Sequence, residues 1–138
     1  MSGTVGKIIY GFIAGAIAVV TVHELINYGL LQAGLFPRVP WSLNPSAMTG
    51  VPQIVSDAFW GGVWGSLFAM LVGGGPVRGA LFGMIGPALL GVFVLVPLLT
   101  ERFPMFFGGA PNMIGSVLLI LAGWGAATAW LYGRMSSN

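Results

Sequence analysis

His23 and Glu24 stand side by side in the stretch TVHELINY (residues 21–28), and both side-chain types can transfer protons or bind metal ions. The chain has no other histidine and only three acidic residues, and the pair follows a long apolar run typical of a membrane-spanning helix. Successive residues of an α-helix point about 100° apart. His23 is therefore predicted to pair with Asn27, and Glu24 with Tyr28, each four residues further on. These four side chains form the candidate polar cluster.

The order of residues 23–27, HELIN, resembles the HExxH helix of zinc metalloproteases. In that helix two histidines one turn apart hold the metal, and the glutamate acts as general base. Here Asn27 replaces the second histidine, and the chain has no other histidine and no cysteine to complete a site. We therefore predict no metal site and no enzymatic activity.

Three other roles remain open for the polar cluster. A lone acidic residue in the first of four membrane helices is similar in outline to the small multidrug transporters, in which the carboxylate exchanges protons for a cationic substrate. Glu24 would then serve a small proton-coupled transporter or channel. A single imidazole is also sufficient to ligate a tetrapyrrole, so His23 is a candidate axial ligand. In the third role, which we favour, the cluster anchors the first helix to the following loop, with Arg38 as the counter-ion.

The cost of membrane insertion explains why the cluster needs a partner. The apolar residues of the first helix favour insertion by roughly 5 kcal/mol on the biological scale. An ionised acid at the bilayer centre costs about 3 kcal/mol on the same scale. Glu24 must therefore be paired, neutral, in contact with water, or close to the outer interface.

The composition is that of a membrane protein. Of 138 residues, 57% are hydrophobic and 6% are charged, whereas soluble proteins average about 25% charged residues. The five basic residues are scattered, which argues against a nucleic-acid partner. A chain of this length suits one domain.

Four apolar windows are long enough to cross a hydrocarbon core about 30 Å thick. We therefore predict an all-α integral membrane bundle of four transmembrane helices, with a longer structured first loop on the outer side. The turn Gly73–Pro76 is short, and it predicts that the second and third helices are antiparallel neighbours. The predicted helices span about residues 8–31, 57–72, 77–99 and 111–132.

The distribution of basic residues gives a weak indication of topology. Lys7, Arg78 and Arg134 fall on one side of the predicted membrane, and Arg38 and Arg102 on the other. Because basic residues are enriched on the cytoplasmic side, both termini are predicted to be cytoplasmic.

Glycines at GxxxG spacing mark three helix faces that allow another helix backbone to approach closely. Two interpretations follow: the faces pack the four helices against one another, or a face lies outward and forms an oligomer. We expect most to pack the bundle and four short helices to leave part of these faces unburied, which predicts a homo-oligomer or a larger membrane complex. Pro87, in the middle of the third helix, is predicted to kink it. The glycine pairs are Gly11 and Gly15, Gly61 and Gly65, and Gly79 and Gly83.

An internal repeat is also suggested by the sequence. Residues 3–22 and 75–94 align without gaps and share identical residues, for example Gly11 with Gly83 and Val20 with Val92. The first and third helices run in the same direction, so a duplication would give two parallel helix hairpins.

Three short motifs carry a family resemblance: PWSLNP (40–45), GVPQ (50–53) and FWGGVWG (59–65). With them the chain resembles a family of small multi-pass membrane proteins of proteobacteria that have no characterised activity. The resemblance implies a location in the bacterial inner membrane. The sequence as a whole favours an assembling or accessory membrane subunit, and the alternative is a transporter or channel that uses Glu24.

Overall fold

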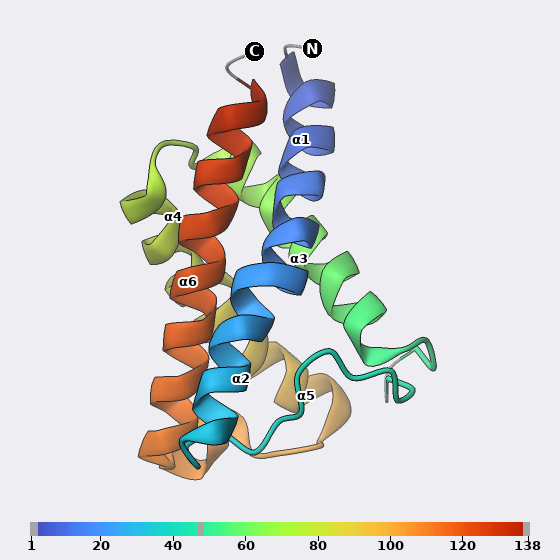
Figure 1. The fold of residues 1–138 in the computed structure, drawn as a ribbon, viewed down its shortest axis with the longest axis vertical. Coiled ribbons are helices and arrows are strands. Elements are labelled where there is room, and N and C mark those ends of the chain that lie inside the picture. Colours follow the sequence, from blue (N-terminus) through green and yellow to red (C-terminus); the bar gives the residue numbers. More distant parts are fainter. Residues whose placement is uncertain (1–2, 47–48, 137–138) are drawn as a thin grey trace.

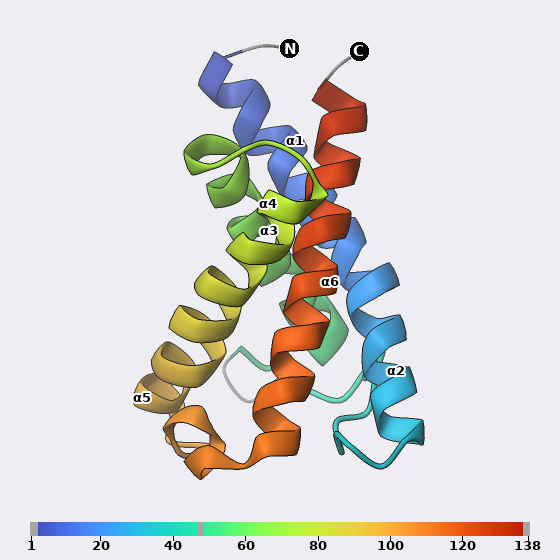
Figure 2. The same ribbon diagram turned by 90° about the vertical axis from the view of Figure 1, so that its left-hand side faces the viewer.

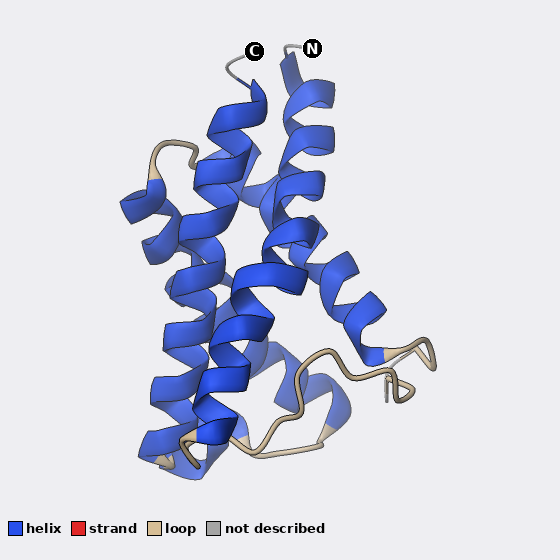
Figure 3. Ribbon diagram, viewed as in Figure 1, coloured by secondary structure: helices blue, strands red, loops and turns tan. Residues whose placement is uncertain are grey.

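The computed structural model describes residues 3–46 and 49–136, and over these residues the fold is all-α. Figure 3 shows the described chain as helices joined by loops, without strands. The helical elements are α1 (Gly3–Ala18), η1 (Val19–His23), α2 (Glu24–Gln32), α3 (Gln53–Leu71), α4 (Pro76–Gly83), η2 (Met84–Leu95), α5 (Val96–Thr100), η3 (Met105–Gly109) and α6 (Pro111–Ser136).

These elements form four continuous helices that are long and apolar enough to cross a membrane, which confirms the predicted fold class. They span Gly3–Gln32, Gln53–Leu71, Pro76–Thr100 and Pro111–Ser136. The second helix begins before its apolar window, directly after Pro52. Proline lacks an N–H group and is tolerated at the start of a helix but not inside it. The observed second helix therefore includes residues 53–56, which precede the predicted apolar window 57–72.

Both described ends of the chain lie at one end of the bundle, and the loops 33–52 and 101–110 lie at the other (Figures 1 and 2). The first helix packs closely on α3, and α4 packs closely on α6, while α6 also lies along α1. Crossing of a membrane by all four helices would place both described ends on the same side.

The six glycines of the predicted faces are all buried inside this bundle. A Cβ atom on Gly15 would overlap the carbonyl oxygen of Gly61, and one on Gly79 would overlap that of Gly125. Gly11 meets Gly65 in the same way. The GxxxG spacings therefore serve helix packing within one chain, and the expectation that they leave a face for oligomer formation is wrong for these six residues.

The two hairpins are built alike. In each, two antiparallel helices meet through glycines, and the first helix contains a π-helical segment. In the alignment of residues 3–22 with 75–94, the four residues Val19–Val22 of η1 correspond to residues 91–94, which lie within η2. The duplication itself stays a prediction, and these shared features are what it would produce.

The second and third helices are neighbours, as the turn at Gly73–Pro76 predicts, but their main chains are not closely packed. Over the described residues, their main chains come close at few positions. They meet instead through rings: Phe82 of α4 lies 5.5 Å from Phe68 and 6.1 Å from Trp64 between centroids. Bulky aromatic side chains hold these two helices apart, whereas glycines let the hairpin partners approach.

Pro87 lies within η2, where the helix is wound more widely instead of being interrupted. A π-helix places its hydrogen bonds five residues apart, which relieves the crowding that a proline ring causes against the carbonyl four residues before it. Gly86 and Pro87 are both buried, and the ring of Trp64 lies directly over Gly86.

Trp124 links the two hairpins through a hydrogen bond in the core. Its side chain is 1% exposed, and its indole Nε1 donates a hydrogen bond of 3.0 Å to the carbonyl oxygen of Gly15. That carbonyl lies in α1 close to the glycine contact with α3, so one indole links α6 to the first hairpin.

Candidate functional site

A group of polar side chains gathers between α2, the loop 33–52 and the first turns of α3. These segments lie at the loop end of the bundle (Figure 1). We call Glu24, Asn27, Arg38 and Asp57 the acid–arginine cluster. Glu24 and Asn27 come from α2, Arg38 from the loop, and Asp57 from α3. The cluster thus joins three segments of the first hairpin.

The π-helical segment η1 sets which residues of the first helix enter the cluster. A π-helix brings residues five apart onto one face, and Val19 and Glu24, five residues apart, are both buried. After this segment, Glu24 and Asn27 both point into the protein at 0% exposure, whereas Tyr28 is 49% exposed. The predicted pairing of Glu24 with Tyr28 is therefore wrong, because Glu24 faces the interior and bonds to Arg38, while Tyr28 lies on the exposed side of α2.

The side chain of Arg38 occupies the centre of the cluster. Its Nη1 lies 3.2 Å from Glu24 Oε2 and 3.4 Å from Glu24 Oε1, and donates to Asn27 Oδ1 at 2.9 Å. Its Nη2 donates to Asp57 Oδ2. One guanidinium therefore bridges the two carboxylates.

The main chain of the loop is fixed at the same place. Asn27 Nδ2 donates to the carbonyl oxygen of Arg38 at 2.7 Å, and the Trp41 N–H donates to Glu24 Oε2 at 3.4 Å. The Trp41 indole donates to the Val20 carbonyl of η1 at 2.9 Å. Asn27 thus binds both the side chain and the main chain of Arg38, and the loop is held at more than one point.

His23 stands at the edge of the cluster. Its Nδ1 lies 3.7 Å from Glu24 Oε1, which is too long for a hydrogen bond. This buried nitrogen has no hydrogen-bond partner in the described part of the chain. The structure does not join His23 to Asn27, whose amide is bound to Arg38. A proton on Nδ1 would face the carboxylate of Glu24.

Sequence reasoning placed Arg38 beside Glu24 but missed three contributors. Asp57 accepts from Arg38, Gln53 Nε2 supports Asp57 Oδ1 at 2.7 Å, and Trp41 supplies its main-chain N–H. The signal for Asp57 was available in the sequence. In a chain with three acids, the two that flank the loop of Arg38 are its nearest candidate partners.

The arrangement does not reproduce a zinc-protease helix. Within the described residues, no three histidine, cysteine or acidic side chains come together as metal ligands would. Asn27, at the position of the second histidine, directs its amide oxygen and nitrogen to Arg38.

The fold and the composition define the class: an all-α bundle with four apolar helices, characteristic of a multi-pass membrane protein. No family model, no curated protein and no solved structure matches the chain.

Proposed function

We propose that this chain is a non-catalytic assembling or accessory subunit of a membrane complex, and that it docks through the loop 33–52. One observation carries the proposal. The described part of this loop exposes apolar side chains while the buried acid–arginine cluster fixes its main chain. Val39 is 61% exposed and Leu43 is 74% exposed, and Arg38 lies one residue before Val39.

The loop is attached at both ends, which supports a role in recognition. Phe36 is buried in the core at its beginning. Near its end, the Gln53 N–H donates to the Asn44 carbonyl at 2.8 Å and the Ile54 N–H to the Ser42 carbonyl at 2.9 Å. A surface ordered before binding loses less conformational entropy when a partner docks. The loop is therefore suited to bind another membrane subunit or a second copy of the chain.

The same proposal includes a location in a bacterial inner membrane with both termini cytoplasmic. The described ends of the chain lie at one end of the bundle (Figure 1). Lys7 near the start of α1, Arg78 near the start of α4 and Arg134 near the end of α6 belong to the helix ends on that side. At the opposite end, Arg38 is neutralised by two carboxylates. Three of the five basic residues thus lie at the terminal end and two, Arg38 and Arg102, at the other, a bias that the positive-inside rule associates with a cytoplasmic side.

The test is native mass spectrometry after extraction in a mild detergent. The wild-type chain should appear as a homo-oligomer or with a stoichiometric membrane partner. Val39→Ser with Leu43→Ser should release the monomer without loss of folded protein. Val5→Ser is the matched control, because Val5 is 63% exposed but lies on α1 at the other end. A monomeric wild-type chain would refute the proposal.

Transport is the second candidate function, and one observation favours it. The unbonded Nδ1 of His23 lies beside the buried Glu24 carboxylate, next to a π-helical segment of the kind often found at functional sites. Against it, Glu24 is fully buried and bonded by Arg38 and Trp41. Proton flux into liposomes that is lost in Glu24→Gln would favour transport. If liposomes with the wild-type protein and liposomes with Glu24→Gln both show only the proton flux of empty liposomes, the docking role is favoured.

A further inference from the structure

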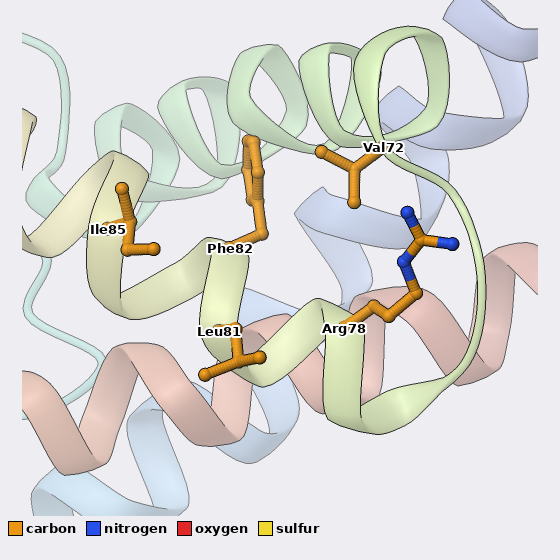
Figure 4. A pocket seen from close by; sticks show the side chains of 5 residues that line it. All are labelled: Val72, Arg78, Leu81, Phe82 and Ile85. Carbon is orange, nitrogen blue, oxygen red and sulfur yellow. The ribbon is translucent and has the colours of Figure 1, made fainter.

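A pocket of about 280 Å³ opens on the side of the bundle, near the end at which the described chain begins and ends. It is formed where α3 ends and α4 begins, and Figure 4 shows the side chains that line it. They are Val72, Arg78, Leu81, Phe82 and Ile85. Four of the five are apolar, and the fifth is a cation.

Arg78 has the placement of a residue that meets the polar end of a lipid. It is the third residue of the helix Pro76–Thr100, so it lies at the edge of the membrane-spanning segment. Figure 4 shows its side chain rising from α4 toward Val72, at the mouth of the pocket. No hydrogen bond or ion pair to it is found among the described residues, in contrast to Arg38.

The turn between the helices makes room for this side chain. Gly74 has φ +93°, a conformation that favours glycine. A Cβ atom there would lie 2.5 Å from Arg78 Cδ and 3.2 Å from Arg78 Nε. A side chain at position 74 would therefore displace Arg78 from the mouth of the pocket.

From Arg78 the lining of the pocket continues along the helix Pro76–Thr100, toward the middle of the membrane-spanning segment. Leu81 and Ile85 lie four residues apart and therefore share one face, and they are 50% and 59% exposed. Phe82 closes the inner side, where its ring contacts Trp64 and Phe68. An apolar groove with a cation at its membrane-surface end matches an acyl chain attached to an anionic headgroup.

We infer that this pocket binds one anionic phospholipid, with the phosphate on the Arg78 guanidinium and an acyl chain along Leu81, Phe82 and Ile85. The start of α4 adds to the attraction, because the N-terminal end of a helix carries partial positive charge. Pro76 at that end has no N–H group, so the free main-chain donors are those of Val77 and Arg78. The ligand that this pocket recognises is therefore a molecule with both a phosphate and an acyl chain, and neither part alone is sufficient.

The experiment compares lipid retention in nanodiscs by native mass spectrometry. Nanodiscs contain equal amounts of phosphatidylglycerol and phosphatidylcholine with the same acyl chains, and the wild-type protein should retain phosphatidylglycerol preferentially. Arg78→Gln should lower this preference about fivefold, the factor expected for one basic residue near a membrane surface. Arg134→Gln is the control at the same end, and it should keep the preference. Equal retention by wild type and Arg78→Gln, or equal loss in both variants, would overturn the inference.

A second measurement tests whether the groove binds the acyl chain of the lipid and not only its headgroup. Phosphatidylglycerol with a photoreactive group in the acyl chain should cross-link to the peptide that contains Leu81 and Ile85. Ile85→Trp should reduce this cross-link by filling the groove, while the charge at Arg78 is unchanged. Complete displacement by free inorganic phosphate, or a cross-link confined to other helices, would show that the groove does not hold the chain.

Discussion

Replacing Arg38 by methionine tests whether the acid–arginine cluster holds the first hairpin together. The substitution removes the only cation that contacts Glu24 and Asp57 in the described chain, while it keeps much of the side-chain volume. Glu24 is 0% exposed and would retain a main-chain donor from Trp41. Asp57 has a side chain 21% exposed and would retain its bond to Gln53, so it is the better protected of the two acids.

The expected cost is about 3 kcal/mol of unfolding free energy. Removing one partner of a buried ion pair typically costs about 3–5 kcal/mol, because the other charge is left without compensation. The lower end applies here, since Arg38 is itself 28% exposed and Asp57 can reach solvent. Glu24→Gln added to Arg38→Met should recover a large part of the loss, because it removes the charge that the first substitution left behind.

The measurement is reversible unfolding in mixed micelles of a non-ionic detergent and sodium dodecyl sulfate, followed by tryptophan fluorescence. Arg102→Met is the matched control: Arg102 is exposed and lies in the other loop at the same end, so its replacement should change stability by no more than about 0.5 kcal/mol. If Arg38→Met costs no more than Arg102→Met, or if Glu24→Gln gives no recovery, the cluster does not stabilise the hairpin as described.

Two further predictions concern the bundle and its topology. Gly15→Ala should destabilise the protein by about 1–3 kcal/mol in the same unfolding assay, because its Cβ would overlap the Gly61 carbonyl and force α1 from α3. Gly115→Ala, with open space around it, should leave stability unchanged or raise it by up to about 1 kcal/mol; equal effects would refute the proposed helix contact. Because the chain has no cysteine, single cysteines report topology: in intact cells a membrane-impermeant maleimide should label Met105→Cys and not Thr4→Cys, and the reverse would invert the proposed orientation.

The number of helices could be predicted from sequence because it depends on length and apolar content alone. Their ends could not be placed from apolar content alone: α1 begins at Gly3 and α6 ends at Ser136, outside the apolar windows 8–31 and 111–132, since main-chain hydrogen bonds continue beyond them. The glycine spacing identified the packing faces correctly. It could not show whether each face meets another part of the chain or a separate molecule, because both require the same close approach of two helix backbones.

The candidate site was only partly predictable. Opposite charge was enough to place Arg38 beside Glu24. Asn27 was correctly expected to help anchor the first helix to the loop, but its partner is Arg38 and not His23. One π-helical segment changes which residues share a face, and the residues of η1, VVTVH, contain no glycine or proline that would indicate it.

The acid–arginine cluster also bears on the order in which the protein is made. Glu24 leaves the ribosome 14 residues before Arg38 and well before Asp57. A first helix inserted by itself would carry an uncompensated acid into the bilayer at a cost of up to about 3 kcal/mol, the value for the bilayer centre. That cost is removed only when the loop and the start of α3 have joined the first helix. Biogenesis is therefore expected to deliver Gly3–Gln32 and Gln53–Leu71 to the bilayer as one helical hairpin.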